Sequence, residues 1–324
     1  MSVPTLNLSD WPVIIVDHLR SSDQPLIVIV GPTAGGKTAF SLDIAEHIAH
    51  TSAQHGWDHA EIINADSRQL YRFMNIGTAK ITEKEKRGVV HHLLDVLHPD
   101  EEATIAWYKE EATKVIADCH RRKVVPLLVG GSMLYISAVV DGLDPLPKAD
   151  PALRKRIEEE YDKDDGWTLF EKLEKIDPAT AHAFDKQNKV YVVRAMELYE
   201  MTGIAPSKLK KTIPPPYQTL MLGLRWPRET IVKRIDERVR QMLRSGWIEE
   251  VEGLMDRGYG PQHPGMKSHG YKEIMMWLSS EERHIDELAD VIARKTRAYA
   301  KRQMTWWDQE ERVLWMGAMQ MIGS

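Results

Sequence analysis

Eight consecutive residues near the start of the chain have the types and spacing of a phosphate-binding loop. The run Gly31-Pro32-Thr33-Ala34-Gly35-Gly36-Lys37-Thr38 fits the pattern G-x-x-x-x-G-K-[ST]. In such a loop, backbone N–H groups and the dipole of the helix that follows stabilise a diphosphate or triphosphate. Lys37 would reach a terminal phosphate, and the hydroxyl of Thr38 would hold Mg²⁺. The loop recognises phosphate groups and does not indicate the compound that carries them.

The other residues suited to chemistry are a carboxylate and two arginines. Asp66 follows an apolar run, where it could hold Mg²⁺ through water or accept a proton from an attacking nucleophile. Ser67 and Gln69, just after it, could orient a second substrate by hydrogen bonds. Arg234 and Arg238 are spaced to share one face of a helix, from which they could close over a diphosphate and stabilise charge on a leaving group. For Arg234, a solvated basic face is the alternative interpretation.

Alternating strands and helices would bring these residues together. The phosphate loop lies between the β-branched run Leu26–Val30 and a helix whose apolar residues are spaced along one face. Further short apolar runs, predicted as strands, lie at residues 61–65, 92–96, 124–129 and 219–224. This order predicts an α/β fold with a right-handed parallel sheet and helices on both faces. Ligands bind at the carboxyl ends of such strands, so the phosphate loop, Asp66 and Gly130-Gly131-Ser132 should meet over one crevice.

Composition divides the chain into an extension, a core and an insert. Residues 1–24 are predicted to be an N-terminal extension with a short helix from Ser9 to Arg20. Residues 25–142 and 214–324 are predicted to form the catalytic core with its C-terminal helices, and residues 143–213 a helical insert. Helices are predicted at residues 105–121, 151–161, 168–175, 190–201 and 228–245, followed by helical structure to about residue 308.

Length and composition are those of an ordinary globular protein. The 324 residues are 43% apolar and 28% charged. No run approaches the ~18 apolar residues of a membrane span, and Asp10 and Asp17 argue against a secretory signal. A single cysteine, Cys119, excludes a disulfide framework and a cysteine-based zinc site, so we expect a cytoplasmic protein. The pair His91-His92 has no evident carboxylate or cysteine to complete a metal site.

A local basic patch is the one sign of nucleic-acid binding, because the net charge of −5 argues against it. From Arg294 to Arg302 the chain carries five basic residues and no acid, and Tyr299, Trp306 and Trp307 lie in or just after this run. A basic helix flanked by aromatic residues could bind a phosphate backbone with unstacked bases nearby. A solvated basic face, with the tryptophans in the core, is the alternative.

Seven short motifs, in order, resemble those of the tRNA dimethylallyltransferases, the tRNA isopentenyltransferase family. The resemblance covers residues 25 to about 308. The motifs are Gly-Pro-Thr-Ala-x-Gly-Lys-Thr at 31–38, Asp-Ser-Arg-Gln-Leu-Tyr at 66–71, Ile-Gly-Thr-Ala-Lys at 76–80, His-His-Leu-Leu-Asp at 91–95, Val-Gly-Gly-Ser-Met-Leu-Tyr at 129–135, Gly-Tyr-Lys at 270–272 and Lys-Arg-Gln-Met-Thr-Trp at 301–306.

This resemblance implies a prenyl transfer. The phosphate loop would bind dimethylallyl diphosphate, and the acceptor would be N6 of adenosine 37 in the anticodon stem-loop of tRNAs that read codons beginning with U. Asp66 would take the proton of the amine, while Lys37, Arg238, and Thr38 with Mg²⁺ would stabilise the departing diphosphate. The adenosine would leave its stack to reach Asp66, and the helical insert would clasp the anticodon stem. The tRNA-binding residues of the family correspond to Asp66, Ser67, Arg68, Gln69, Ser132, Arg154, Val190, Tyr191, Arg194, Lys267, Ser268, His269, Gly270, Tyr271, Lys272, Lys301, Arg302, Gln303, Thr305 and Trp306.

Three positions depart from the family pattern. Ser132 stands where threonine is usual, Tyr191 replaces an arginine, and Asn75 replaces an aspartate. These departures concern tRNA affinity rather than the reaction. Without a zinc finger like that of eukaryotic relatives, the chain resembles a bacterial form, and we expect a monomer. The alternatives are an adenylate isopentenyltransferase that acts on free AMP, ADP or ATP, a small-molecule kinase with the same loop, and a nucleic-acid-binding switch protein.

Overall fold

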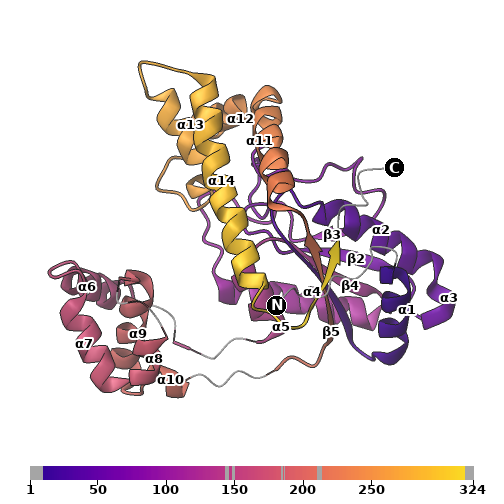
Figure 1. Cartoon of the computed structure of the whole chain (residues 1–324), viewed down its shortest axis with the longest axis horizontal. Coiled ribbons are helices and arrows are strands. Elements are labelled where there is room, and N and C mark those ends of the chain that lie inside the picture. Colours follow the sequence, from indigo (N-terminus) through magenta and orange to yellow (C-terminus); the bar gives the residue numbers. More distant parts are fainter. Residues whose placement is uncertain are drawn as a thin grey trace. The chain divides into compact units, whose positions relative to one another are not determined.

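Six parallel strands form one sheet in the part of the chain that the structure describes, in the order β3-β2-β4-β1-β5-β6 (Figure 1). The structure is a computed structural model and describes residues 10–142, 146–147, 150–183, 185, 187–209 and 214–317. The strands are β1 (Pro25–Val30), β2 (Ala60–Asn64), β3 (His91–His92), β4 (Val125–Val129), β5 (Gln218–Arg225) and β6 (Val313–Gly317). Because β1 pairs with both β4 and β5, the strand that carries the phosphate loop is central. The predicted α/β fold is confirmed.

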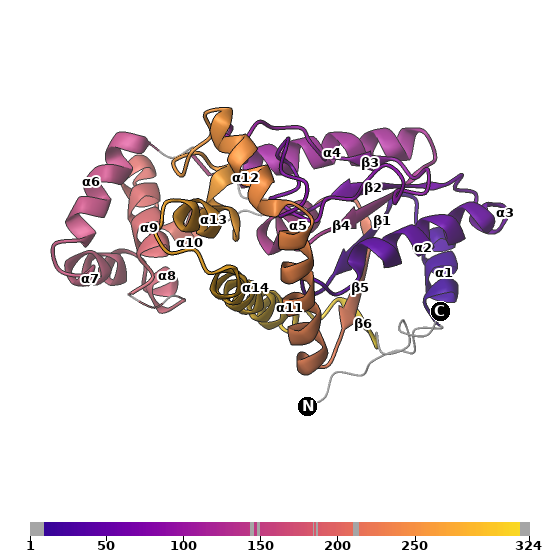
Figure 2. The ribbon, with the colours of Figure 1, turned by 90° about the horizontal axis from the view of Figure 1, so that it is seen from above.

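Helices cover both faces of this sheet (Figure 2). α4 (Ile105–Arg121) and α5 (Met133–Val140) pack on one face, and α1 (Trp11–Ser21) and α2 (Lys37–His50) pack on the other. A short helix, α3 (Ser52–His55), follows α2. β1, β2 and β4 are buried along their whole length, as continuous apolar runs predict for strands covered on both faces.

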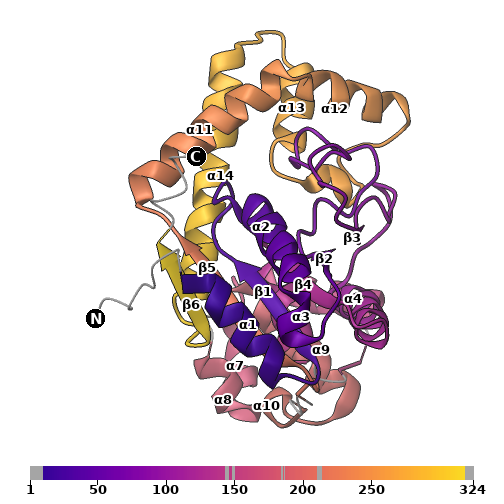
Figure 3. The same ribbon diagram turned by 90° about the vertical axis from the view of Figure 1, so that its right-hand side faces the viewer.

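A second group of helices follows the carboxyl end of β5 (Figure 3). α11 (Arg228–Arg244) buries Ile231, Ile235 and Val239, the apolar face expected from their spacing. α14 (Ile285–Trp307) lies along α11. Between these two helices in the chain come α12 (Trp247–Asp256), a 3₁₀ turn (Gly265–Lys267) and α13 (Tyr271–Leu278).

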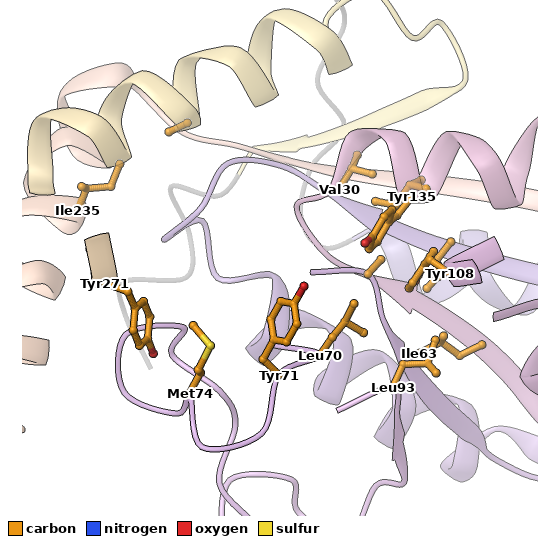
Figure 4. Close-up of a cluster of buried hydrophobic side chains, with 14 of the residues drawn as sticks. Val30, Ile63, Leu70, Tyr71, Met74, Leu93, Tyr108, Tyr135, Ile235 and Tyr271 are labelled. Carbon is orange, nitrogen blue, oxygen red and sulfur yellow. The ribbon is translucent and has the colours of Figure 1, made fainter. Parts of the chain in front are cut away.

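The larger core cluster joins this helical group to the sheet. It includes Val30 and Ile63 from the strands, and Ile235 and Tyr271 from α11 and α13 (Figure 4). Within it, the rings of Tyr108 and Tyr135 stack with their centroids 4.1 Å apart. The helices that follow β5 therefore share one hydrophobic core with the sheet.

A second compact unit, Asp141–Pro215, is helical in its described part, and the first unit consists of Met1–Val140 and Pro216–Ser324. Its helices are α6 (Pro151–Tyr161), α7 (Trp167–Ile176), α8 (Pro178–His182), α9 (Lys189–Thr202) and α10 (Pro206–Leu209). They enclose a core of their own, in which Ile157, Leu173 and Val192 are fully buried. Parts of the predicted linkers (143–145, 148–149 and 210–213) and residues 1–9 of the predicted extension lie outside the described residues.

Two elements differ from the sequence-based expectation. The apolar run at residues 92–96 forms only the two-residue strand β3, because Leu93 and Asp95 have φ values of 58° and 54°, which no strand accommodates. No strand is predicted from the sequence after residue 308, yet Val313–Gly317 pairs with β5 at the sheet edge. No helix in the described ranges is both long and apolar enough to cross a membrane.

Candidate active site

The phosphate loop joins the carboxyl end of β1 to the first turn of α2. Gly31 has a φ of 138°, and a Cβ on it would lie 2.9 Å from the carbonyl oxygen of Leu224 in β5. Gly36 precedes α2 with a φ of 88°, a left-handed conformation that glycine adopts at little cost. The first N–H groups of α2 have no partners within the helix. The loop and this helix end therefore have the geometry that anion binding requires.

The side chain of Lys37 folds back over the loop. Its Nζ donates hydrogen bonds to the carbonyl oxygens of Gly31 (3.1 Å) and Pro32 (2.9 Å). Burial lowers the pKa of Lys37 to about 8, because its surroundings disfavour the charged form; Asp66 opposes this shift and Arg238 adds to it. An anionic ligand in the loop would favour the charged form again, so Lys37 is placed to neutralise a bound phosphate group.

Two arginines of α11 line the same cleft as the loop. The guanidinium of Arg234 lies 4.5 Å from the ring centroid of Trp226, a cation–π contact. Trp226 itself donates to the carbonyl oxygen of Gly35 at 2.8 Å. Burial lowers the pKa of Arg238; Asp66 opposes this shift, and Arg234 adds to it. Both arginines therefore face the phosphate loop rather than open solvent.

Asp66 follows β2 and begins a tight turn. Its Oδ1 accepts the N–H of Arg68 at 2.9 Å. Asn64 supports the turn, because its Oδ1 accepts the N–H of Asp66 at 3.0 Å and its Nδ2 donates to the carbonyl of Asp66 at 3.1 Å. Within the described ranges, no hydrogen bond reaches Oδ2 of Asp66. The turn therefore fixes the carboxylate and leaves one oxygen free to accept a proton.

The end of β4 packs directly against this turn. A Cβ on Gly130 would lie 2.1 Å from the carbonyl carbon of Ala65, so the two strand ends approach this closely only because residue 130 is glycine. Oγ of Ser132 accepts the N–H of Ser67 at 2.9 Å, and the N–H of Ser132 donates to Ala65 at 3.0 Å. The hydroxyl group that serine shares with threonine thus holds the Asp66 turn. The three segments meet as the sequence predicts.

These segments border a cleft of about 1300 Å³ and a smaller cavity of about 160 Å³. The cleft is lined by the phosphate loop and the arginines, whereas the cavity includes apolar side chains such as Ile235, Val239 and Trp247. Asp66 and Arg238 line both. The arrangement can hold a diphosphate on one side, stabilise its departure, and take a proton from a nucleophile on the other.

The cleft also offers two oxygen donors of the kind that Mg²⁺ prefers. They are the hydroxyl of Thr38, exposed in the first turn of α2, and the carboxylate of Asp66. Mg²⁺ usually keeps several waters and binds through one or two protein oxygens plus substrate phosphates. This small donor set therefore fits the ion.

The basic run Arg294–Arg302 lies on α14 and is divided between two uses. Lys295 forms an ion pair with Glu273 at 2.5 Å, and Arg297 forms one with Asp236, so these two charges hold α14 to α13 and α11. The other basic residues, Arg294, Lys301 and Arg302, are exposed, as are Thr305 and Trp306. Tyr299 is half-buried and donates to the carbonyl of Gly131 at 2.9 Å. Trp306 is 38% exposed, as a ligand-binding residue would be, whereas Trp307 is 1% exposed and belongs to the core.

Most of the residues that the resemblance assigns to tRNA lie at the surface of the first unit or line its cavities. Arg68, Lys267, His269 and Lys272 are exposed, and Ser67, Gln69 and Ser132 are half-buried. Gly270 is buried, as are Ser268, Tyr271 and Gln303, whose exposed fractions are 2%, 0% and 1%.

The polar groups of the three buried side chains have hydrogen-bond partners within the protein, so their assignment to direct tRNA contact stays a prediction. Gln303 accepts the N–H of Thr33 at 2.8 Å and donates to the carbonyl of Gly131 at 2.9 Å. Ser268 donates to Gly265, and Tyr271 donates to a glutamate on α12. A contact with tRNA through these groups would require their internal hydrogen bonds to break. Tyr271 and Gln303 therefore support the site, whereas Ser268 also lines the smaller cavity.

Four of the assigned residues belong to the second unit. At the start of α9, Val190 is 63% and Tyr191 42% exposed. Arg154 is half-buried on α6. Arg194 donates to Glu197, a fully buried carboxylate, at 2.7 Å, so its charge is used inside the unit.

A buried polar cluster brings together residues that the sequence did not connect. Both oxygens of Glu61 accept from Arg122, at 2.8 and 2.7 Å, and Nε2 of His92 lies 2.7 Å from Oε2 of Glu61. Ligand atoms of Glu61, His92 and Cys119 lie within 4.8 Å of one another, so a carboxylate and a cysteine do lie beside His92, although these three groups are one short of a tetrahedral set. Burial and the Glu61 charge raise the pKa of the Cys119 thiol to about 12. With Arg122 on both carboxylate oxygens, the cluster is an ion-pair network.

Comparison with known proteins decides the family. The family model described as IPP transferase matches residues 69–310. The chain belongs to the IPP transferase family. The matched span runs from the turn after Asp66 through the second unit to just beyond the end of α14. The family that the seven motifs indicate is thus confirmed.

Relatives named for their activity match along nearly the whole chain. The chain is 38% identical over 298 residues to a tRNA dimethylallyltransferase of Geobacter sulfurreducens, covering 91% of this chain and 92% of the relative. It is 40% identical over 295 residues to one of Symbiobacterium thermophilum, covering 90% and 89%.

Solved structures of the family have the same fold. The crystal structure of the tRNA isopentenylpyrophosphate transferase from Bacillus halodurans superposes with a TM-score of 0.66 at 36% identity, covering 91% of this chain and 90% of that one. A eukaryotic dimethylallyltransferase, described as acting on tRNA, has a TM-score of 0.76 at 27% identity and covers 92% of this chain and 75% of its own.

Proposed function

We propose that this protein is a tRNA dimethylallyltransferase. It transfers a dimethylallyl group from dimethylallyl diphosphate to N6 of adenosine 37, in tRNAs that read codons beginning with U, and releases diphosphate. The observation that carries this proposal is that the phosphate loop, Arg238 and Asp66 line one cleft in a member of the IPP transferase family. The relative described as acting on tRNA supports tRNA as the acceptor.

The donor binds with its diphosphate in the phosphate loop. As the bond between C1 and oxygen breaks, its electron pair leaves with the diphosphate, and negative charge grows on the bridging oxygen. Lys37 and Arg238 line the cleft where this charge develops, so they stabilise the leaving group more than the bound donor. Mg²⁺ at Thr38, when bound, would neutralise further diphosphate charge.

The acceptor reaches the same centre from the smaller cavity. N6 of the adenine forms the new bond to C1 and loses one proton to Asp66, whose Oδ2 has no hydrogen-bond partner in the described structure. The cavity walls include Ser67, His269 and Tyr299. A base inside a stack cannot enter such a space, so the adenosine flips out of the anticodon loop first.

A nearby alternative is the same chemistry on free AMP, ADP or ATP. The exposed residues Lys301, Arg302 and Trp306 on α14 favour a large polyanionic acceptor, because a mononucleotide would leave such a surface unused. A small-molecule kinase would use the same loop but would turn over ATP.

The test is a competition between acceptors with purified protein. Dimethylallyl diphosphate and Mg²⁺ are supplied with an anticodon stem-loop that carries adenosine 37, with the same stem-loop carrying guanosine 37, or with AMP. Nucleoside mass spectrometry and diphosphate release measure the products. We expect prenylation of the first stem-loop alone. Faster transfer to AMP would favour the adenylate enzyme, and ATP turnover without prenyl transfer would favour a kinase.

We further propose that the enzyme acts as a monomer in the cytoplasm. The phosphate loop, Arg238 and Asp66 all come from one chain, so the catalytic centre needs no second copy. Light scattering of the purified protein with and without stem-loop tests the oligomeric state.

A further inference from the structure

Residues 75–80 form a loop, the 75–80 loop, that contributes to both cavities. Gly77 and Thr78 line the smaller cavity, and Ala79 lines the larger cleft. The segment forms turns rather than a helix or a strand. Because its backbone is not paired with a neighbouring strand or within a helix, its N–H groups need other hydrogen-bond acceptors to keep the loop in place.

One carboxylate on α12 accepts three consecutive N–H groups of this loop. Oε2 of Glu250 accepts from Asn75 and Ile76, both at 2.7 Å, and Oε1 accepts from Gly77 at 3.2 Å. The hydroxyl of Tyr271 on α13 donates to the same Oε1 at 2.5 Å. Hydrogen bonds to an ionised acceptor are roughly twice as strong as neutral ones. Glu250 therefore connects the loop to α12 directly and to α13 through Tyr271.

A tryptophan on the same face of α12 completes this attachment. Trp247, 2% exposed, lies against the loop so closely that a Cβ on Gly77 would be 1.9 Å from its Nε1. A Cβ on Gly270, the residue before α13, would likewise be 2.0 Å from the indole ring. Figure 4 shows Tyr271 beside Met74, the residue that precedes the loop. Packing and the carboxylate therefore hold the loop from the same side.

The loop in turn orients a polar side chain of the cleft. Nε2 of Gln69 donates to the carbonyl oxygens of Thr78 at 3.0 Å and Ala79 at 3.3 Å. Gln69 lies on the turn that Asp66 begins and lines the larger cleft with it. Because the amide nitrogen is used by the loop, Oε1 of Gln69 is the end that remains for a ligand.

We propose that Glu250 is a positioning residue for prenyl transfer. It fixes the 75–80 loop, and the loop fixes the Gln69 amide beside Asp66. This inference rests on the proposed function. When an amide replaces the carboxylate, its NH2 group takes the place of one acceptor oxygen and faces loop N–H groups, so the loop carbonyls shift away from Gln69. A displacement of about 1 Å at a reacting centre costs on the order of 10²-fold in rate.

The experiment compares Glu250→Gln with Glu252→Gln, an exposed carboxylate on the same helix. Prenylation of the anticodon stem-loop is measured at saturating donor and stem-loop, per folded protein as determined by circular dichroism. Glu250→Gln is expected to lower kcat by about 10- to 100-fold. The KM for dimethylallyl diphosphate should change by less than about threefold, because the phosphate loop keeps its own contacts. Glu252→Gln should match the wild type.

A double-mutant cycle with Gln69→Ala separates positioning from a general loss of structure. If Glu250 acts through Gln69, the double variant is no slower than the slower single variant, within about threefold. Should Glu250→Gln fail to fold, Glu250→Asp, with its shorter carboxylate, enters the same cycle. Wild-type kcat in the Glu250 variant, or rate losses that multiply, would overturn the inference. A wild-type enzyme that transfers no prenyl group would instead overturn the proposed function, and this inference with it.

Discussion

The buried carboxylate Glu61 should contribute stability that acid removes. It is 4% exposed, and its pairing with Arg122 and His92 lowers its pKa from 4.5 to about 2. That difference corresponds to about 3 kcal/mol of stability near neutral pH. The folded pKa lies below the unfolded value, so the contribution is full above pH 4.5 and is lost as pH falls towards 2. About 2 kcal/mol should be gone by about pH 3.

The single cysteine provides a local assay. Cys119 is fully buried beside Glu61, so pulse labelling with a thiol reagent that reacts in acid reports unfolding of this unit alone. Urea titrations of wild type and Glu61→Gln are compared at about pH 6 and about pH 3. The wild type should be more stable at the higher pH, and its advantage should shrink by about 2 kcal/mol at the lower. Glu252→Gln, which changes an exposed carboxylate, is the control.

Two outcomes would refute this reasoning. One is a difference between wild type and Glu61→Gln that stays constant from about pH 6 to about pH 3, because it would mean that Glu61 keeps its ordinary pKa. The other is a Glu61→Gln variant as stable as the wild type at the higher pH.

Two further predictions concern the site and the 75–80 loop, and a third concerns α12. The pKa of Lys37 is lowered to about 8, so the KM for dimethylallyl diphosphate should rise roughly tenfold per pH unit above that pH, because Lys37 loses its charge. Lys37→Arg should remove this pH dependence. A KM of the wild type that does not change with pH would contradict the assignment. Gly77→Ala should lower stability by about 1–3 kcal/mol and reduce prenyl transfer, because its Cβ would lie 1.9 Å from Trp247; an unchanged thermal midpoint would argue against the close packing. Gly253→Ala, on the same helix and with no atom within 4 Å of its Cβ, should instead stabilise by about 0.5–1 kcal/mol in urea titration, and a loss of stability there would contradict the structure of α12.

The sequence predicts the central elements well because their signals are local. The helix expected at residues 105–121 and the one at 151–161 are observed with the same bounds. The phosphate loop, Asp66 and the end of β4 meet because parallel strands align their carboxyl ends, a consequence of topology alone.

The parts that escape prediction depend on contacts between distant residues. β6 is five residues long and pairs only with β5 among the described strands, so neither its length nor its pattern distinguishes it from an apolar loop. The network around Glu61 joins residues 58 positions apart in the chain. Glu250 looks in the sequence like any acid of an amphipathic helix, and its role follows from the loop that faces it.

The buried members of the assigned tRNA site show a further limit. A motif identifies residues that are important for function. It does not distinguish residues that contact a ligand from residues that support those contact residues. Tyr271 and Gln303 belong to motifs and are fully or almost fully buried, with their polar groups on Glu250 and the phosphate loop. Only the packing distinguishes the two roles.

The account depends most on Asp66 as the group that takes a proton from an adenine in tRNA. Mass spectrometry of tRNA nucleosides from cells that lack this protein tests it most directly. We expect N6-dimethylallyladenosine and its derivatives to be absent from position 37, to return with the wild-type gene, and to stay absent with Asp66→Ala, although that variant still binds the stem-loop. Persistence of the modified nucleoside in cells without the protein, or its return with Asp66→Ala, would contradict the account.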